Sequence, residues 1–155
     1  MTLDALESVR QHAAQVFRCG SGSVHGPHHW RKVEKTGLLI APEVGADIET
    51  VQLFAVLHDC CRMDDGGDPE HGPRAAQMVR DLADSLIRVD SARLETLIFA
   101  ICHHTDGTTS YDPTIGTCWD ADRLDLGRVG IIPSPSRMST QAGRKIAELG
   151  SAYLC

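Results

Sequence analysis

Long apolar segments are absent from this sequence of 155 residues. No run reaches the length of about 18 apolar residues that a membrane-spanning helix needs, so we expect no membrane span. The first residues, Met-Thr-Leu-Asp, also lack the basic and apolar segments of a signal peptide. These absences predict a protein of the cytoplasm.

Aromatic residues and basic clusters are also scarce. Aromatic residues make up 5% of the sequence, the formal net charge is −6, and no block of lysine or arginine occurs. A sequence-independent nucleic-acid binder needs a positive surface, so this composition argues against one. It still allows a small phosphorylated substrate that is held locally by a metal and a few arginines.

Cysteine pairs with metal-binding spacing are missing as well. None of the six cysteines forms a C-x-x-C motif, which argues against a zinc ribbon. Cys60 and Cys61 are adjacent, a poor arrangement for a disulfide, and we expect reduced, mostly buried thiols. Repeats and low-complexity linkers are absent too, so the length predicts one domain over residues 1–155.

The apolar residues that are present recur at helical spacing along the whole chain. The predicted helices lie at about 3–18, from 29 to between 42 and 45, and at 48–58, 69–86, 91–104, 113–126 and 141–149. Their start signals include Asp47, Asp90 or Ser91, Ser139 or Thr140, and the Asp-Pro pairs at 68–69 and 112–113. No segment is a confident strand, so we predict an all-α bundle of about six to seven helices.

The most informative stretch is Ala55-Val56-Leu57-His58-Asp59, where an apolar helix ends in an adjacent His-Asp pair. A carboxylate in this setting is costly unless something pairs with it. A cation is the usual partner, and imidazole with carboxylate suits Zn, Mn, Fe, Ni or Co. The alternative from the pair alone is a buried, hydrogen-bonded His-Asp pair without a metal.

Further candidate ligands follow at helix ends along the chain: His29, His71, His103, His104 and Asp122. Taken singly, each of them is an ordinary polar residue. Asp120 or Asp125 can replace Asp122 in this scheme, and an acid stabilised by Arg123 is the alternative there. Together these residue types favour one shared metal centre.

The order of these residues resembles the HD superfamily of metal-dependent phosphohydrolases. The likeness runs from His29 to Asp122 and includes Val33 after the first histidine, His-Gly-x-x-Ala-Ala at 71–76 and Ala-Asp-Arg-Leu at 121–124. It implies an HD-like helical bundle with its metal-site core at 25–128. The Gly-Tyr-Pro extension of the cyclic-dinucleotide phosphodiesterase branch is missing after His104.

Residue by residue, the resemblance implies a first metal held by His29, His58, Asp59 and Asp122. In members with two metals, Asp59 bridges, and His71 with His104 or His103 completes the second centre. The cofactor is then one or two divalent ions, with Mn, Fe, Ni, Co, Zn and Mg as candidates. Asp59 and His58 are the predicted catalytic residues.

The predicted reaction is hydrolysis of a small phosphate ester or nucleotide by a metal-bound hydroxide. A divalent ion lowers the pKa of bound water from 15.7 to about 7 in favourable sites. Guanidinium groups suit phosphate because they offer a bidentate fork. The candidate phosphate ligands are Arg62, Arg74, Arg123 and Arg128.

Two other functions fit the same residues. An HD-type oxygenase would use the histidines to hold two irons that activate oxygen. A non-catalytic domain would keep a structural metal and bind a ligand or partner. The sequence by itself does not separate a phosphomonoesterase from a phosphodiesterase, nor does it indicate an oligomeric state.

Overall fold

This computed structural model describes residues 2–150. They contain seven α-helices and two short 3-10 helices, joined by loops. The α-helices are α1 (Leu3–Val16), α2 (Pro27–Val44), α3 (Ile48–Leu57), α4 (His71–Asp81), α5 (Ser91–His103), α6 (Pro113–Leu124) and α7 (Gln141–Leu149); the 3-10 helices are η1 (Leu126–Val129) and η2 (Pro135–Arg137). Within residues 2–150 the only β-type pairing is one isolated bridge, so the all-α prediction is confirmed. No helix among them has the length and apolarity needed to cross a membrane.

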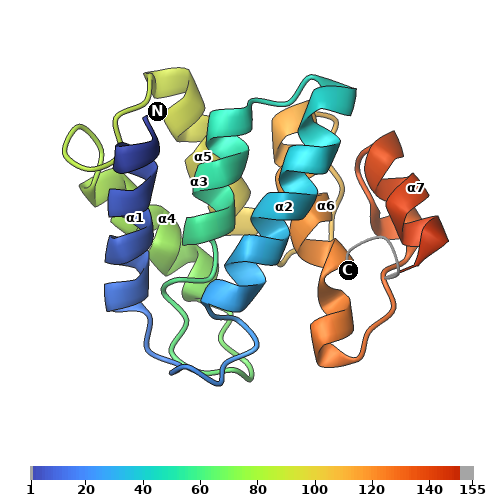
Figure 1. Cartoon of the computed structure of the whole chain (residues 1–155), viewed down its shortest axis with the longest axis horizontal. Helices are drawn as coiled ribbons and strands as arrows, with labels where there is room; N and C mark the ends of the chain where they lie inside the picture. Colours follow the sequence, from blue (N-terminus) through green and yellow to red (C-terminus); the bar gives the residue numbers. More distant parts are fainter. Residues whose placement is uncertain (1, 151–155) are drawn as a thin grey trace.

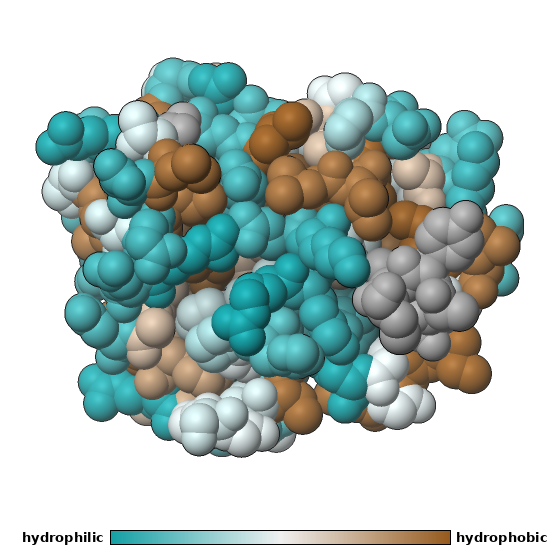
Figure 2. Space-filling model, viewed as in Figure 1, coloured by the Kyte–Doolittle hydropathy of each residue, from teal (hydrophilic) through white to brown (hydrophobic). Residues whose placement is uncertain are grey.

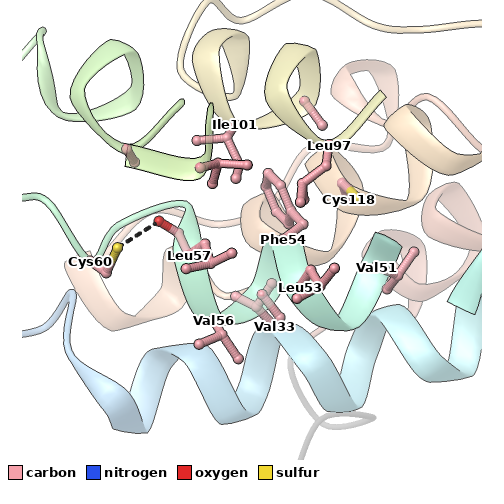
Figure 3. Packing of buried hydrophobic residues seen from close by; sticks show 14 of the residues in the cluster. Val33, Val51, Leu53, Phe54, Val56, Leu57, Cys60, Leu97, Ile101 and Cys118 are labelled. Atoms are coloured by element: carbon pink, nitrogen blue, oxygen red, sulfur yellow. Dashed lines mark hydrogen bonds between the residues drawn. The ribbon is translucent and has the colours of Figure 1, made fainter. Parts of the chain in front are cut away.

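Helix α3 is the central element of the bundle. Every residue from Thr50 to Leu57 except Gln52 is buried, and a helix that is apolar on all sides belongs in a core. Helices α1, α2, α5 and α6 all contact it. Figure 3 shows Phe54 on α3 directed toward Leu97 of α5 and Cys118 of α6, while Val56 and Val33 meet on the side of α2.

Side-chain caps fix most of the helix starts where the sequence predicts them. Asp47, Asp90 and Asp112 each accept a hydrogen bond from a backbone amide in the first turn of α3, α5 and α6. Thr140 does the same for α7. These bonds satisfy amide groups that a helix cannot pair internally, which is why short polar residues mark the boundaries.

Helix α4 is shorter at both ends than the sequence predicts. It begins at His71 rather than after Asp68, because the Asp68 carboxylate accepts from the backbone amide of Met63 and from Arg74. It ends at Asp81, because the chain then reverses at Asp84, whose φ of 64° is left-handed. The expected continuation to residue 86 is therefore a compact turn.

Helix α7 packs at the end of the bundle opposite α1 (Figure 1). A second, smaller apolar cluster joins it to α2 and α6 through Ile40, Leu124, Met138 and Ala147. Figure 2 shows the surface of this view: hydrophilic residues cover its middle, and apolar patches lie beside them. One apolar groove in the described part of the chain runs between Leu39 of α2 and Leu149 of α7.

Two loops meet at one edge of the bundle, at the bottom of Figure 1. Residues 17–26 enter α2 and residues 58–70 leave α3. The loops are joined by a hydrogen bond from the Cys19 thiol to the Arg62 carbonyl, 3.5 Å, and by another from Ser23 to Asp65. This edge therefore collects the end of α3 and the starts of α2 and α4.

Gly72 allows α4 to approach α5 closely, and we predict that Gly72→Ala destabilises the protein. A Cβ atom there would lie 2.9 Å from the carbonyl oxygen of Ile101, a contact that backbone cannot relieve cheaply. The expected loss is about 1–3 kcal/mol of unfolding free energy, measured by urea denaturation. Gly67→Ala is the control, since nothing lies within 4 Å of its Cβ position; equal losses in both variants would contradict the packing argument.

Candidate metal centre

His58 and Asp59 continue the last turn of α3 and are almost fully buried, with exposed fractions of 0% and 1%. The amide of His58 donates to the carbonyl of Phe54, so the chain is still helical there. The His58 ring stacks on Phe54, with ring centroids 4.9 Å apart. The apolar helix thus delivers an imidazole and a carboxylate into the interior of the molecule.

Four buried histidines each have one ring nitrogen bound to an oxygen atom that can only accept. The acceptors of Nδ1 are a carboxylate oxygen of Asp125 for His29 at 2.8 Å, the Phe54 carbonyl for His58 at 3.1 Å, the Asp68 carbonyl for His71 at 2.5 Å and the Ile101 carbonyl for His104 at 2.7 Å. Each Nδ1 therefore carries a proton, and Nε2 is the nitrogen available for other contacts. Metal-ligating histidines are held by outer hydrogen bonds of this kind.

The free nitrogens of these rings face one another in pairs. His29 Nε2 lies 3.1 Å from His58 Nε2, and His71 Nε2 lies 2.9 Å from His104 Nε2. Two lone pairs at these distances repel unless a proton or a cation lies between them. The facing Nε2 atoms of each pair are therefore suited to bind a cation.

Asp59 stands between the two histidine pairs. Its Oδ2 lies 3.7 Å from His29 Nε2 and 3.6 Å from His58 Nε2. Its Oδ1 lies 3.2 Å from His71 Nε2 and 3.6 Å from His104 Nε2. One carboxylate thus presents one oxygen to each pair.

Asp122 of α6 completes the first pair. Its Oδ1 lies 3.2 Å from His29 Nε2 and 3.7 Å from His58 Nε2. This oxygen is buried and has no hydrogen-bond partner among the described residues, a costly state for a carboxylate unless a cation takes the place of a donor. His29, His58 and Asp59 offer ligand atoms within 4.8 Å of one another, as do Asp59, His71 and His104. The residues therefore fit divalent metal binding.

The pKa values of the cluster follow from burial and from the carboxylates. Burial lowers the pKa of His58 to about 3, so this ring is neutral near pH 7. Burial also opposes the charged form of His29 and of His104, but Asp122 and Asp125 for the first, and Asp59 for the second, raise the pKa overall. Each histidine pair thus includes a ring that readily holds a proton in the absence of a cation.

Burial opposes the ionised form of both carboxylates as well, and their neighbours outweigh it. The surrounding imidazoles, His58 first and then His104, His25 and His71, hold the pKa of Asp59 well below its usual range. His29 and His58 lower the pKa of Asp122 in the same way. Both groups are therefore anionic at neutral pH, and the buried oxygens of Asp59 and Asp122 need positive charge beside them.

Comparison with known proteins agrees with this arrangement. The family model described as "HD domain" matches residues 28–130, more than half of the chain. The chain belongs to the HD domain family. The crystal structure of a predicted HD superfamily hydrolase from an uncultured Thermotogales bacterium has the same fold, with a TM-score of 0.73, 22% sequence identity, and coverage of 98% of this chain and 86% of that one. No curated protein sequence matches the chain.

Within this HD domain, six of the predicted site residues come together: His29, His58, Asp59, His71, His104 and Asp122. His103 does not join them, because its side chain is 43% exposed and pairs with Asp106. Which of the two adjacent histidines points inward depends on how α5 ends, and the Ile101 carbonyl holds His104 toward the cluster.

The candidate arginines of the HD domain divide into two groups. Arg62 donates to Asp59 Oδ1 at 2.9 Å, and Arg128 Nη2 lies 3.7 Å from Asp122 Oδ1. The other two do not reach the cluster. Arg74 binds Asp68 and the Cys61 carbonyl, and Arg123 donates to the Arg137 carbonyl and lies over the Trp119 ring.

Two residues at the site were not assigned these positions by the sequence. His25 lies in the loop before α2, and its Nδ1 is 2.9 Å from Asp59 Oδ2. Asp125, considered only as a substitute for Asp122, instead holds the outer nitrogen of His29. The third acid of that segment, Asp120, faces away and accepts from the amides of Ser139 and Thr140.

The protonation of His29 and His104 predicts that metal binding releases protons. Their pKa values are raised, so a fall in pH protonates the Nε2 atoms that a metal needs and weakens binding. We expect the affinity for Mn²⁺ to fall steadily from about pH 8 to about pH 5, the range in which histidines titrate. Calorimetric titration in buffers with different ionisation enthalpies counts the protons. An affinity independent of pH, with no proton release, would contradict this assignment.

Proposed function

We propose that the protein is a metal-dependent phosphohydrolase that acts on a small phosphate ester or a nucleotide. The observation that carries the proposal is the Asp59 carboxylate, which presents one oxygen to each of two histidine pairs. Such a donor set suits two divalent ions that share a carboxylate, and sites of that type cleave phosphoesters.

The first ion would be held by His29, His58, Asp59 and Asp122, and the second by His71, His104 and Asp59. When bound, such ions lower the pKa of a water molecule and neutralise negative charge on the reacting phosphate. The protein's part is to fix the donor atoms, and the outer bonds of the four Nδ1 atoms do so.

Two arginines are positioned to receive a phosphate. Arg128 is fixed by bonds from Nε to the Val24 carbonyl and from Nη1 to the Asp125 carbonyl, which leaves Nη2 beside Asp122. Arg62 approaches Asp59 from the other side. Their side chains are 12% and 11% exposed, while the histidines of the cluster are at most 3% exposed. The arginines lie with Asp122, whose side chain is 14% exposed, on the less buried side of the centre, which favours a substrate that inserts a small anionic group.

Loss of the shared carboxylate should abolish turnover. We expect the metal-loaded protein to release phosphate or alcohol from at least one member of a panel of phosphomonoesters, phosphodiesters and nucleotides, tested with Mn, Co, Mg, Ni and Fe. Asp59→Asn keeps the side-chain shape but removes the charge, and we expect more than about a 100-fold loss, beyond the usual cost of losing an outer-shell partner.

The matched control for that experiment is Asp106→Asn, which removes an exposed carboxylate that also pairs with a histidine. Full activity in Asp59→Asn, or no turnover by the wild type with any metal, would overturn the proposal. Oxygen consumption by the iron-loaded protein, without phosphoester cleavage, would favour the oxygenase alternative.

Arg128 should contribute mainly to substrate binding. We expect Arg128→Gln to raise KM by about 10- to 100-fold, the range for losing a charge-assisted hydrogen bond of about 1.5–3 kcal/mol, with a smaller change in kcat. Arg80→Gln is the control, because Arg80 is exposed and pairs with Glu95 on the surface. An unchanged KM in Arg128→Gln would remove Arg128 from the phosphate site.

A further inference from the structure

His25 contacts the centre without being one of its ligand candidates. Its ring is buried, and Nδ1 lies 2.9 Å from Asp59 Oδ2, the oxygen that faces His29 and His58. No group of ligand atoms that could hold a metal includes His25 among the described residues. The residue therefore contacts the centre from outside, through Asp59.

The contact fixes which nitrogen of His25 carries a proton. A carboxylate with a depressed pKa accepts hydrogen bonds, so Nδ1 must donate to Asp59. Arg128 Nη2 lies 3.5 Å from the same nitrogen and cannot donate to it, because the nitrogen already carries its proton. The Nδ1–H group is thus committed to Asp59 Oδ2.

The loop holds His25 in place from three directions. Its amide donates to Ser23 Oγ at 3.0 Å, and its carbonyl accepts from Trp30 Nε1 at 2.8 Å. A Cβ atom on the next residue, Gly26, would lie 3.2 Å from the Phe17 ring, so the turn is packed closely there. A backbone fixed to this degree places the His25 ring in a defined position beside Asp59.

The two oxygens of Asp59 each receive one such outer donor. His25 donates to Oδ2, on the side of His29 and His58, and Arg62 Nε donates to Oδ1 at 2.9 Å, on the side of His71 and His104. The carboxylate cannot rotate without breaking both bonds. His25 and Arg62 therefore fix which oxygen of Asp59 faces which histidine pair.

We propose that His25 is a positioning residue of the metal centre: its Nδ1–H group holds Asp59 Oδ2 toward His29, His58 and Asp122, and so sets the affinity of that half of the centre. Arg62 does the same for the other half. The inference depends on metal binding at this cluster and not on the identity of the substrate.

Two amide substitutions test whether His25 acts through its Nδ1–H group. Asparagine places its amide nitrogen near the position of Nδ1, so His25→Asn can still donate to Asp59. Glutamine reaches the position of Nε2 instead, so His25→Gln removes that donor at similar polarity. His103→Asn is the matched control, because His103 Nδ1 pairs with Asp106 on the surface at a similar separation, 2.8 Å.

The readout is Mn²⁺ binding, measured by equilibrium dialysis and by the electron paramagnetic resonance signal of free Mn²⁺. We expect His25→Gln and His25→Ala to weaken one class of site by about 10- to 100-fold, the usual effect of an outer-shell partner. His25→Asn and His103→Asn should stay within about threefold of the wild type. Arg62→Gln should weaken the other class.

The outcomes that overturn the inference are distinct from those that concern the centre itself. Wild-type affinity in His25→Gln and His25→Ala, or a loss in His25→Asn with wild-type binding in His25→Gln, would exclude a role through Nδ1. A wild-type protein that binds no Mn²⁺ would overturn the metal centre. Thermal unfolding of the metal-free variants tests folding, and if His25→Ala does not fold, the comparison of the two amides decides.

Discussion

The buried carboxylate of Asp59 is the constraint on which the rest of the structure depends. Helix α3 is apolar on every side and ends by placing this group in the interior with 1% of its surface exposed. An ionised carboxylate there is very costly unless donors surround it. The donors are His25 from the loop before α2 and Arg62 from the loop after α3, and the ring nitrogens of His71 from α4 and His104 from α5 face the same carboxylate. The packing of the bundle therefore brings these groups together around the Asp59 carboxylate.

The helical packing explains why these donors can meet. Helices α3 and α5 end at the centre, while α2 and α4 begin there, so both ring pairs join the end of one helix to the start of another. The carbonyl groups at a helix end have no partner within the helix. In the last turns of α3 and α5, the Ala55 and Ile101 carbonyls accept from the outer nitrogens of His58 and His104. Backbone carbonyls that need a hydrogen-bond partner at the helix ends thus hold the histidines of the site in place.

Sequence patterns predicted the helices and the ligand types well, because caps and apolar spacing act locally. They failed where a side chain's direction depends on distant packing. His103 and His104 are equivalent in the sequence, and the Ile101 carbonyl turns only the second toward the centre. Asp120, Asp122 and Asp125 lie within two turns, and their contacts with Ser139, His58 and His29 separate their roles. Asp68 has the pattern of a cap but binds Arg74 instead. His25 precedes its helix, so no helical spacing connects it with Asp59, 34 residues later.

The charges around the centre support an anionic substrate. Among the described residues that contact the cluster, the acids Asp59, Asp122 and Asp125 are matched by Arg62, Arg128 and Lys32, whose ammonium group lies 3.3 Å from Asp125. When the histidines are neutral, as metal ligands must be, these three acids and three basic groups balance one another. Each divalent ion then adds two positive charges to a buried, low-dielectric site, where uncompensated charge is costly. A phosphate group that enters beside Arg128 would supply the missing negative charge, which supports the proposed phosphorylated substrate.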